Sequence, residues 1–206
     1  MEKTVKRLIN IYPNQISKLY IWLKHKLTPF KAINNTVPEN GSILDIGCGN
    51  GMYAIYLFLK NNKRSITGID NNKKRINYAN KVSRNIKQLK FKYLDLNKEY
   101  KLDKYNCYLI NDVLHHISDK SKVKLLKKVY MNMRKNDILV IKDMHYMNKI
   151  KFILNYINDK IMTLGSKLYF IESHILLELL KKLGFKVSYK KIDGYLFPHI
   201  IFICRK

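Results

Sequence analysis

The sequence is poor in the features that mark secreted, membrane-spanning or metal-binding proteins. Its 206 residues include only three cysteines, and Cys48, Cys107 and Cys204 form no Cys-x-x-Cys pair and would leave one thiol over if two were bridged. We therefore expect reduced thiols and no metal site. No apolar run approaches the roughly 20 residues of a membrane-spanning helix, and no secretory signal is visible at the start. These absences favour a soluble, cytoplasmic protein.

Acidic residues are also scarce. The chain has 40 Lys and Arg but only 15 Asp and Glu, which gives a formal net charge of +25. A basic surface attracts RNA through counterion release and attracts anionic membrane surfaces in the same way. The lysines, however, are spread along the whole chain beside abundant Asn, Ile and Tyr, a bias that AT-rich coding also produces. The charge alone does not choose among these readings.

The order of apolar segments predicts alternating strands and helices. Buried strands are expected at residues 43–46, 65–69, 91–94, 105–111, 137–141, 185–189 and 199–204. Helices are expected within 2–27, with a break at Pro13, and at 52–60, 73–86, 120–133 and 172–183. No repeat or Gly/Ser-rich linker divides the chain. This pattern indicates one α/β domain with a parallel sheet covered on both faces and ligands at the carboxyl ends of its strands.

A cluster of glycines follows the first strand in ILDIGCGNG, residues 43–51. Glycine allows positive φ and lets a ligand approach the backbone closely. The spacing of Gly47, Gly49 and Gly51 is not the Gly-x-Gly-x-x-Gly of dinucleotide loops, nor the phosphate loop that ends in Gly-Lys-Ser/Thr. Asp45 lies two residues before the first glycine. The three glycines together suggest a ligand, but neither of these two loop types fits them.

DIGCGNG resembles the first motif of class I S-adenosylmethionine-dependent methyltransferases, and the resemblance extends over roughly residues 30 to 206. It implies a Rossmann-like, seven-stranded, mostly parallel sheet flanked by helices, with an antiparallel last strand. It also implies S-adenosyl-L-methionine as the cofactor. The cofactor-binding residues that this resemblance assigns are Asp45, Gly47, Cys48, Gly49, Gly51, Asp70, Asn71, Asp95, Leu96 and Asn111. In this assignment Asp45 faces the methionine ammonium group, Asp70 the ribose hydroxyls and Asp95 the adenine.

The resemblance also divides the single domain into four parts. Residues 1–36 are expected to form an N-terminal helical cap, 37–143 the cofactor-binding core, 144–171 a helical insert or lid, and 172–206 the final helix and closing hairpin. The insert carries apolar residues at helical intervals with lysines between them. An amphipathic basic helix of this kind suits a pocket lid or an anionic membrane surface. Together with Tyr20 and Trp22 it would make an apolar cap over the transferred methyl group.

Two histidines are candidates for the catalytic base. Asn111–His116 reads NDVLHH and resembles the DVLHH stretch of small-molecule methyltransferases. Methyl transfer from a sulfonium depends mainly on alignment, and a base is needed only if the acceptor arrives protonated. His115 or His116 could accept that proton if it lies within hydrogen-bond reach, and His145 is a further candidate.

Other acceptors fit the sequence less well. Methylation of amino groups of bases needs a proline-containing element that is absent after residue 111, and Cys107 lies within its strand rather than after it, unlike the cysteine nucleophile of pyrimidine carbon methylation. Ribose 2′-O-methyltransferases use a Lys-Asp-Lys-Glu set. Asp112 and Lys142 could stand in for its middle pair, but the closing strand IIFICRK lacks the expected Glu. Asp112 and Asp143 lack a third metal ligand.

The sequence therefore predicts a methyltransferase acting on a small-molecule or lipid-like acceptor, on oxygen, in the cytoplasm or at the membrane surface. The alternatives are an RNA methyltransferase and a cofactor-binding protein that has lost transfer activity. The oligomeric state is not predicted.

Overall fold

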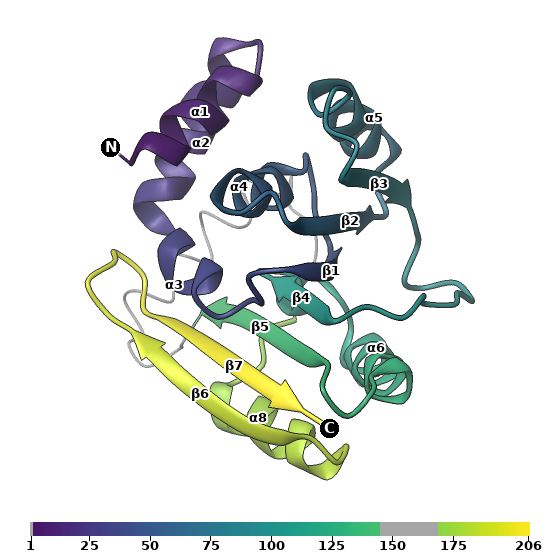
Figure 1. Cartoon of the computed structure of the whole chain (residues 1–206). Helices are drawn as coiled ribbons and strands as arrows, with labels where there is room; N and C mark the ends of the chain where they lie inside the picture. Colours follow the sequence, from purple (N-terminus) through teal and green to yellow (C-terminus); the bar gives the residue numbers. More distant parts are fainter. Residues whose placement is uncertain (1, 145–168) are drawn as a thin grey trace.

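The computed structural model describes residues 2–144 and 169–206 and is built around one seven-stranded sheet (Figure 1). The strand order is β3-β2-β1-β4-β5-β7-β6. The strands are β1 (Gly41–Ile46), β2 (Arg64–Asp70), β3 (Leu89–Tyr93), β4 (Cys107–Asn111), β5 (Ile138–Met144), β6 (Lys186–Ile192) and β7 (His199–Arg205). Pairing is parallel from β3 through β5, and β7 runs antiparallel to both β5 and β6. The expected fold class is confirmed.

Three helices precede the sheet: α1 (Lys3–Ile11), α2 (Gln15–Leu27) and α3 (Phe30–Asn34). The expected break at Pro13 separates the first two, and Asn14 caps α2 by accepting a hydrogen bond from the Ser17 amide at 2.6 Å. The sequence patterns did not predict α3. It forms because Phe30 and Ile33 turn into the core, where both are fully buried.

The remaining helices cover the two faces of the sheet. Helix α4 (Met52–Lys60) has the bounds expected from the sequence, whereas α5 (Lys73–Val82) is shorter than expected. It ends early because Ser83 occupies its C-terminal cap and its hydroxyl donates to the Ala79 carbonyl at 2.8 Å. Helices α1 to α5 cover one face, and α6 (Asp119–Asn132) with α8 (Ser173–Lys182) covers the other.

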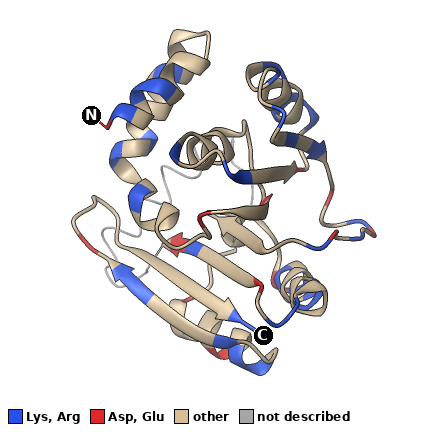
Figure 2. Ribbon diagram, viewed as in Figure 1, with Lys and Arg blue, Asp and Glu red and all other residues tan. Residues whose placement is uncertain are grey.

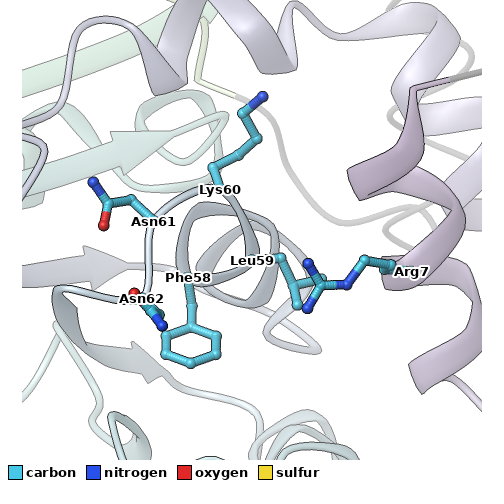
Figure 3. Close-up of a pocket in the computed structure, with 6 residues that line it drawn as sticks. All are labelled: Arg7, Phe58, Leu59, Lys60, Asn61 and Asn62. Carbon is cyan, nitrogen blue, oxygen red and sulfur yellow. The ribbon is translucent and has the colours of Figure 1, made fainter.

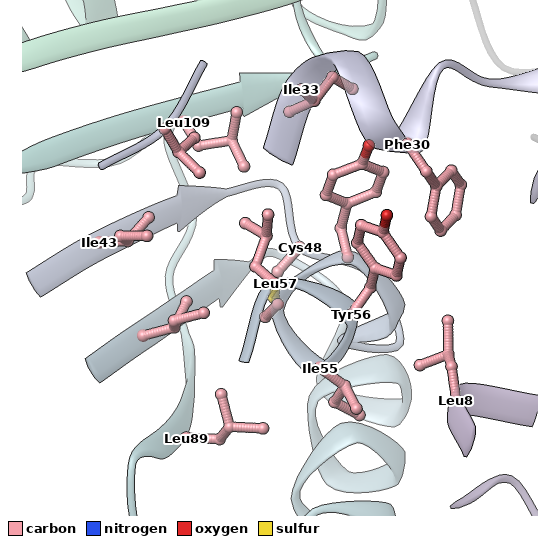
Figure 4. Close-up of a cluster of buried hydrophobic side chains, with 14 of the residues drawn as sticks. Leu8, Phe30, Ile33, Ile43, Cys48, Ile55, Tyr56, Leu57, Leu89 and Leu109 are labelled. Carbon is pink, nitrogen blue, oxygen red and sulfur yellow. The ribbon is translucent and has the colours of Figure 1, made fainter. Parts of the chain in front are cut away.

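Alternate strand residues feed two hydrophobic clusters. Ile43 and Leu109 pack with Leu57 and Tyr56 of α4 on one face (Figure 4). Neighbouring strand residues such as Leu44 pack on the other face with α6 and α8. This alternation follows from the two-residue period of strand side chains. A sheet buried on both faces leaves its strand ends as the place for polar side chains.

Two expectations about position change in the structure. The third strand ends at Tyr93, so Asp95 lies two residues beyond it in a turn, where its carboxylate accepts from the Asn97 amide at 3.0 Å. The helical insert expected at 144–171 lies outside the described residues from 145 to 168, and so does His145. None of the helices in the described ranges is long and apolar enough to cross a membrane.

Candidate active site

The glycine loop joins β1 to α4 and is fixed by the neighbouring strand. The amides of Gly47 and Cys48 both donate to the Ile69 carbonyl, at 2.7 and 3.0 Å. Gly47 has φ +76°, and a Cβ there would lie 2.4 Å from a methyl carbon of Val113. Only glycine combines this backbone angle with so close an approach. The first glycine is therefore required by packing against the segment after β4.

Gly49 differs because no atom lies within 4 Å of the place where its Cβ would be. Its amide donates to Oδ2 of Asp70 at 2.9 Å, and the Asn72 amide donates to Oδ1 at 2.9 Å. Asp70 is 8% exposed at the end of β2. The middle of the loop thus leaves open space beside a nearly buried carboxylate.

Asp45 is 2% exposed, and its Oδ2 has no hydrogen-bond partner in the described part of the chain. Burial raises the pKa of Asp45 to about 7, and the nearby Asp70 carboxylate acts in the same direction. A buried carboxylate oxygen without a partner is costly. The arrangement fits a ligand that brings a cationic donor into this position.

The N-terminal helices reach the same loop. Tyr12, which follows α1, is buried, and its hydroxyl donates to the Asn50 carbonyl at 2.9 Å. Asn14 and Ser17 lie within 3.0 Å of the Tyr78 hydroxyl on α5. The segment between α1 and α2 is therefore tied both to the glycine loop and to α5.

An ion pair between a buried lysine and a partly exposed aspartate lies near the ends of β4 and β5. Nζ of Lys142 donates to Oδ1 of Asp112 at 2.6 Å, and the Lys142 side chain is 1% exposed. Burial alone would raise the pKa of Asp112, but Lys142 and, more weakly, Lys24 and His115 hold it well below its usual range. Asp112 has φ +56°, a left-handed conformation that Asp tolerates.

His115 lies on the opposite face of the sheet from Lys142. Its Nδ1 is 2.9 Å from Oδ1 of Asp143, which follows Lys142 in β5, and both side chains are buried. The Phe170 ring stacks on the His115 ring at 5.9 Å, and the Tyr169 amide donates to the His115 carbonyl at 2.8 Å. A carboxylate bound at Nδ1 fixes the tautomer in which Nε2 is the basic nitrogen.

His116 is exposed, unlike His115, although the two rings lie 4.1 Å apart. Partial desolvation of its imidazole lowers the pKa of His116 to about 4, and the neighbouring His115 acts in the same direction. His116 is therefore neutral at pH 7 and a weaker base than an ordinary histidine.

Two further polar side chains at this edge were missed by sequence reasoning. His199 begins β7, and its Nε2 donates to the Leu27 carbonyl at 2.7 Å, while its Nδ1 is buried and has no partner among the described residues. The Tyr53 hydroxyl on α4 is also buried and has no hydrogen-bond partner among the described residues. Burial lowers the pKa of His199 to about 4, with Lys142 adding to the effect. Only their positions, just after the glycine loop and at the start of the last strand, could have pointed to them.

The other assigned residues are placed as follows. Asn111 ends β4, and its buried Oδ1 has no partner among the described residues. Asn71 is exposed, and Asp95 and Leu96 are half-buried. The Leu94 amide donates to the Asp70 carbonyl at 3.0 Å, which keeps the start of the Asp95 turn beside the end of β2. The loop, Asp45 and Asp70 thus form one group, with Asn111 and the Asp95 turn at its sides.

Metal and thiol chemistry find little support at this edge. Within residues 2–144 and 169–206, no group of three or more His, Cys, Asp or Glu side chains is arranged to hold a metal ion. All three cysteines are buried and free, and burial raises the pKa of the Cys48 thiol far above its usual value.

A separate pocket lined by Arg7 and residues 58–62 lies at the far end of α4 from the glycine loop (Figure 3).

Comparison with known proteins agrees with this geometry. A family profile described as a methyltransferase domain matches residues 38–187. No curated protein sequence matches the chain.

Solved structures share the fold. The pyocyanin biosynthetic protein PhzM is 14% identical with a TM-score of 0.73, and the match covers 98% of this chain and 62% of that chain. An O-methyltransferase family 2 protein from Planctomyces limnophilus DSM 3776, in complex with apigenin, is 13% identical with a TM-score of 0.69, covering 86% and 57%. Magnesium protoporphyrin IX methyltransferase (ChlM) from Synechocystis PCC 6803, with bound SAH, is 17% identical with a TM-score of 0.68, covering 98% and 93%. The chain thus spans about three fifths of the length of the first two.

Proposed function

The chain belongs to the methyltransferase domain family. On that premise we propose that it is an S-adenosylmethionine-dependent methyltransferase that methylates a hydroxyl group of a small or lipid-like molecule, with His115 as the base. The observation that carries this proposal is the contact between Nδ1 of His115 and Oδ1 of Asp143. It prepares one nitrogen of a buried imidazole to accept a proton.

The residues at the glycine loop fit S-adenosylmethionine. Oδ2 of Asp45 is buried without a partner among the described residues, as expected for a carboxylate that receives the methionine ammonium group. The open space at Gly49 allows the cofactor to approach the backbone beside Asp70. When bound, the cofactor supplies a methyl group on a positively charged sulfur.

The full set of residues proposed to hold the cofactor is Asp45, Gly47, Cys48, Gly49, Gly51, Asp70, Asn71, Asp95, Leu96 and Asn111. Asp70 faces the ribose in this proposal, because a carboxylate at the end of the second strand can accept from both ribose hydroxyls. The two hydrogen bonds that it already accepts from Gly49 and Asn72 hold it in place.

The protein's own contribution to transfer is alignment and proton removal. Asp143 orients His115, and the Met144 amide, which also donates to Oδ1 of Asp143 at 2.8 Å, orients Asp143 in turn. A hydroxyl acceptor within reach of Nε2 of His115 would lose its proton as the oxygen attacks the methyl carbon. His116 is the second candidate for this step, although its lowered pKa makes it a weaker base.

The acceptor is proposed to be apolar and ring-containing or lipid-like. Among the similar structures, one is a complex with apigenin and another is named as a magnesium protoporphyrin IX methyltransferase, and both of these molecules contain rings. A cytoplasmic location, with peripheral attachment to an anionic membrane surface, belongs to the same proposal. The basic composition supports that attachment.

The test is to incubate the protein with methyl-labelled S-adenosylmethionine and a whole-cell extract, then to separate organic-phase molecules, small aqueous molecules, RNA and protein. Label in the organic or small-molecule fraction is the expected result. Base-labile label would indicate a carboxyl ester, whereas base-stable label on oxygen would support a hydroxyl acceptor.

An RNA acceptor is the second candidate, and the ion pair between Lys142 and Asp112 is the observation that favours it. These two residues match the middle of the Lys-Asp-Lys-Glu set of ribose 2′-O-methyltransferases. Label that nuclease releases from the RNA fraction would replace the small-molecule proposal with this one. Cofactor binding without label in any fraction would indicate a protein that has lost transfer.

A further inference from the structure

Helix α2 presents a large apolar face to solvent. Ile16, Leu19, Trp22 and Leu23 are 84%, 58%, 43% and 43% exposed. They lie on one side of the helix, because residues three, four and seven positions apart share a face. Isolated exposed apolar residues are ordinary, but a contiguous group on one helix indicates an interaction site.

The opposite side of α2 is fixed to the protein. Ile21 is 1% exposed and belongs to the hydrophobic cluster on the α4 face. Helices α1 and α2 pack against each other and stand together at one corner of the molecule, outside the layer formed by α4 (Figure 1). The apolar face is therefore held outward by a folded support.

The two helices that carry this face are basic. Between Glu2 and Glu39 the sequence contains no acidic residue. Lys3, Lys6 and Arg7 of α1 and Lys26 of α2 are exposed, and Figure 2 shows basic segments repeated along both helices. A partner for this surface must offer apolar contact and negative charge together.

We propose that the exposed face of α2, on a pair of helices whose charged residues from 3 to 27 are all basic, docks on the surface of a membrane that contains anionic lipids. Such a surface satisfies both requirements, since apolar side chains enter the boundary of the acyl chains while lysines contact the headgroups. A second copy of the chain suits this surface less well, because a symmetric contact would bring the same basic residues toward one another.

Docking at α2 would bring the membrane close to the edge of the sheet where the candidate active site lies. The helix ends at Leu27, whose carbonyl accepts the hydrogen bond from His199. Tyr12, just before α2, binds the glycine loop through Asn50. The relation to catalysis and the attachment to a membrane both rest on the proposed function, and the assignment of that attachment to α2 deepens it; vesicle binding tests this assignment without any methyl transfer.

Trp22 is the only tryptophan of the chain, so its fluorescence reports directly on this face. The purified protein, without cofactor, is titrated with vesicles of phosphatidylcholine alone and with vesicles that also contain phosphatidylglycerol. The expected result is a blue shift of the emission and cosedimentation with the anionic vesicles only. Binding should weaken as salt rises, because salt screens the lysines.

Two variants and a matched control locate the contact. The double change Leu19→Gln and Leu23→Gln should lower the affinity for anionic vesicles at least about tenfold, because two leucine side chains that the membrane would bury are removed. Met131→Gln on α6, where Met131 is 68% exposed, makes the same kind of change elsewhere and should leave the affinity unchanged. Lys3→Gln with Lys6→Gln should weaken binding and reduce its dependence on salt.

The proposal is overturned if anionic vesicles leave the emission of Trp22 unchanged, or if the Leu19 and Leu23 variant binds them as tightly as the control does. It is also overturned if sedimentation without lipid shows a dimer that this variant abolishes, because a second copy then covers the face. Methyl transfer to soluble acceptors is measured separately, so loss of vesicle binding and loss of transfer remain distinguishable.

Discussion

The backbone amide of Gly49 donates a hydrogen bond to Oδ2 of Asp70 across 2.9 Å. The carboxylate at the end of β2 therefore holds the middle of the glycine loop, and the proposed contact with the cofactor ribose uses a side chain that is already fixed. Loop position and cofactor affinity should consequently depend on the same residue.

Replacing Asp70 tests this dependence. Asp70→Ala removes an ionised acceptor from both the loop and the ribose, and we expect the affinity for S-adenosylhomocysteine to fall roughly 10- to 100-fold, since hydrogen bonds to charged groups contribute about 1.5–3 kcal/mol. Asp70→Asn keeps one acceptor oxygen and should lose less. Isothermal titration calorimetry measures both.

Asp193, exposed in the turn between β6 and β7, provides the control for the Asp70 variants. Asp193→Ala should bind S-adenosylhomocysteine as the unmodified protein does. Unchanged affinity in Asp70→Ala would remove Asp70 from the ribose site.

Asp45 predicts a pH dependence of cofactor binding. Its pKa of about 7 means that about half of the carboxyl groups hold a proton at neutral pH, and the methionine ammonium group binds the ionised form. The affinity should rise up to about tenfold per pH unit below pH 7 and level off above it. Calorimetry between pH 5.5 and 8 measures this, and Asp45→Asn should flatten the curve. A flat curve in the unmodified protein would contradict the assignment.

The same group affects folding in the opposite sense. A carboxyl whose pKa is raised in the folded state gives stability that is full below its ordinary pKa of 3.8 and is lost as the pH rises through 7. The free protein should therefore gain more thermal stability from S-adenosylhomocysteine at pH 8 than at pH 6. Thermal unfolding with and without the ligand gives both values, and an equal gain at the two pH values would argue against this linkage.

For catalysis, His115→Gln should lower kcat about 100-fold or more with a hydroxyl acceptor, as expected when a general base is removed. The affinity for S-adenosylhomocysteine should change little. Asp143→Asn, which leaves His115 in place but disturbs its tautomer, should lower kcat with little change in KM. His174→Gln, at an exposed position on α8, is the matched control. A normal rate in His115→Gln would pass the role to His116 or remove it altogether.

At Gly47, alanine should destabilise the protein by about 2–4 kcal/mol, because a positive φ costs a residue with a Cβ about 1–2 kcal/mol and that Cβ would collide with Val113. Combining Gly47→Ala with Val113→Ala relieves the collision but not the backbone cost. Chemical denaturation of the two single variants and the double variant measures the coupling. Additive effects would show that Val113 does not limit the space at Gly47.

Arg64 is 2% exposed, and its guanidinium donates to the carbonyls of Pro38 and Leu57 and to Oδ1 of Asn34, at 2.6–2.9 Å. Arg64→Met should lower the free energy of unfolding by about 3 kcal/mol, because several buried acceptors lose their donor. Lys63→Met, at the neighbouring exposed position, should have little effect. Denaturation midpoints compare the two, and equal midpoints would show that the contacts of Arg64 contribute nothing net.

Much of the fold could be predicted because its signals are local. The helix at 52–60 was predicted with its observed bounds, since it begins at the glycine loop and carries a continuous apolar face. Helix α3 was missed because its five residues are too short to show a period, and they fold there through tertiary burial of Phe30. The end of α5 at Val82 depends on a serine cap that the apolar pattern does not show.

Some residues of the candidate site could likewise be predicted from the sequence, and others could not. Asp45, Gly47 and Asp70 could be placed together from the sequence because they lie at or beside the ends of β1 and β2, and the ends of parallel strands meet at one edge. His199 was missed because β7 enters the sheet out of sequence order and brings His199 to the end of α2. Tyr53 was missed because its place in the apolar pattern of α4 does not show that its hydroxyl is buried without a partner among the described residues. The side-chain contact between His115 and Asp143 joins residues 28 positions apart, which no spacing rule contains.

The position of β7 between β5 and β6 also has a consequence for synthesis on the ribosome. Strand β5 ends at residue 144, but β7, which pairs with its second edge, begins only at residue 199. Until residues 199–205 leave the exit tunnel, the hydrogen-bonding edge of β5 stays open, and β6 has no strand to join. An open edge invites pairing with other chains. The nascent protein is therefore most exposed to aggregation in this interval, and chaperone contacts during translation should be concentrated there.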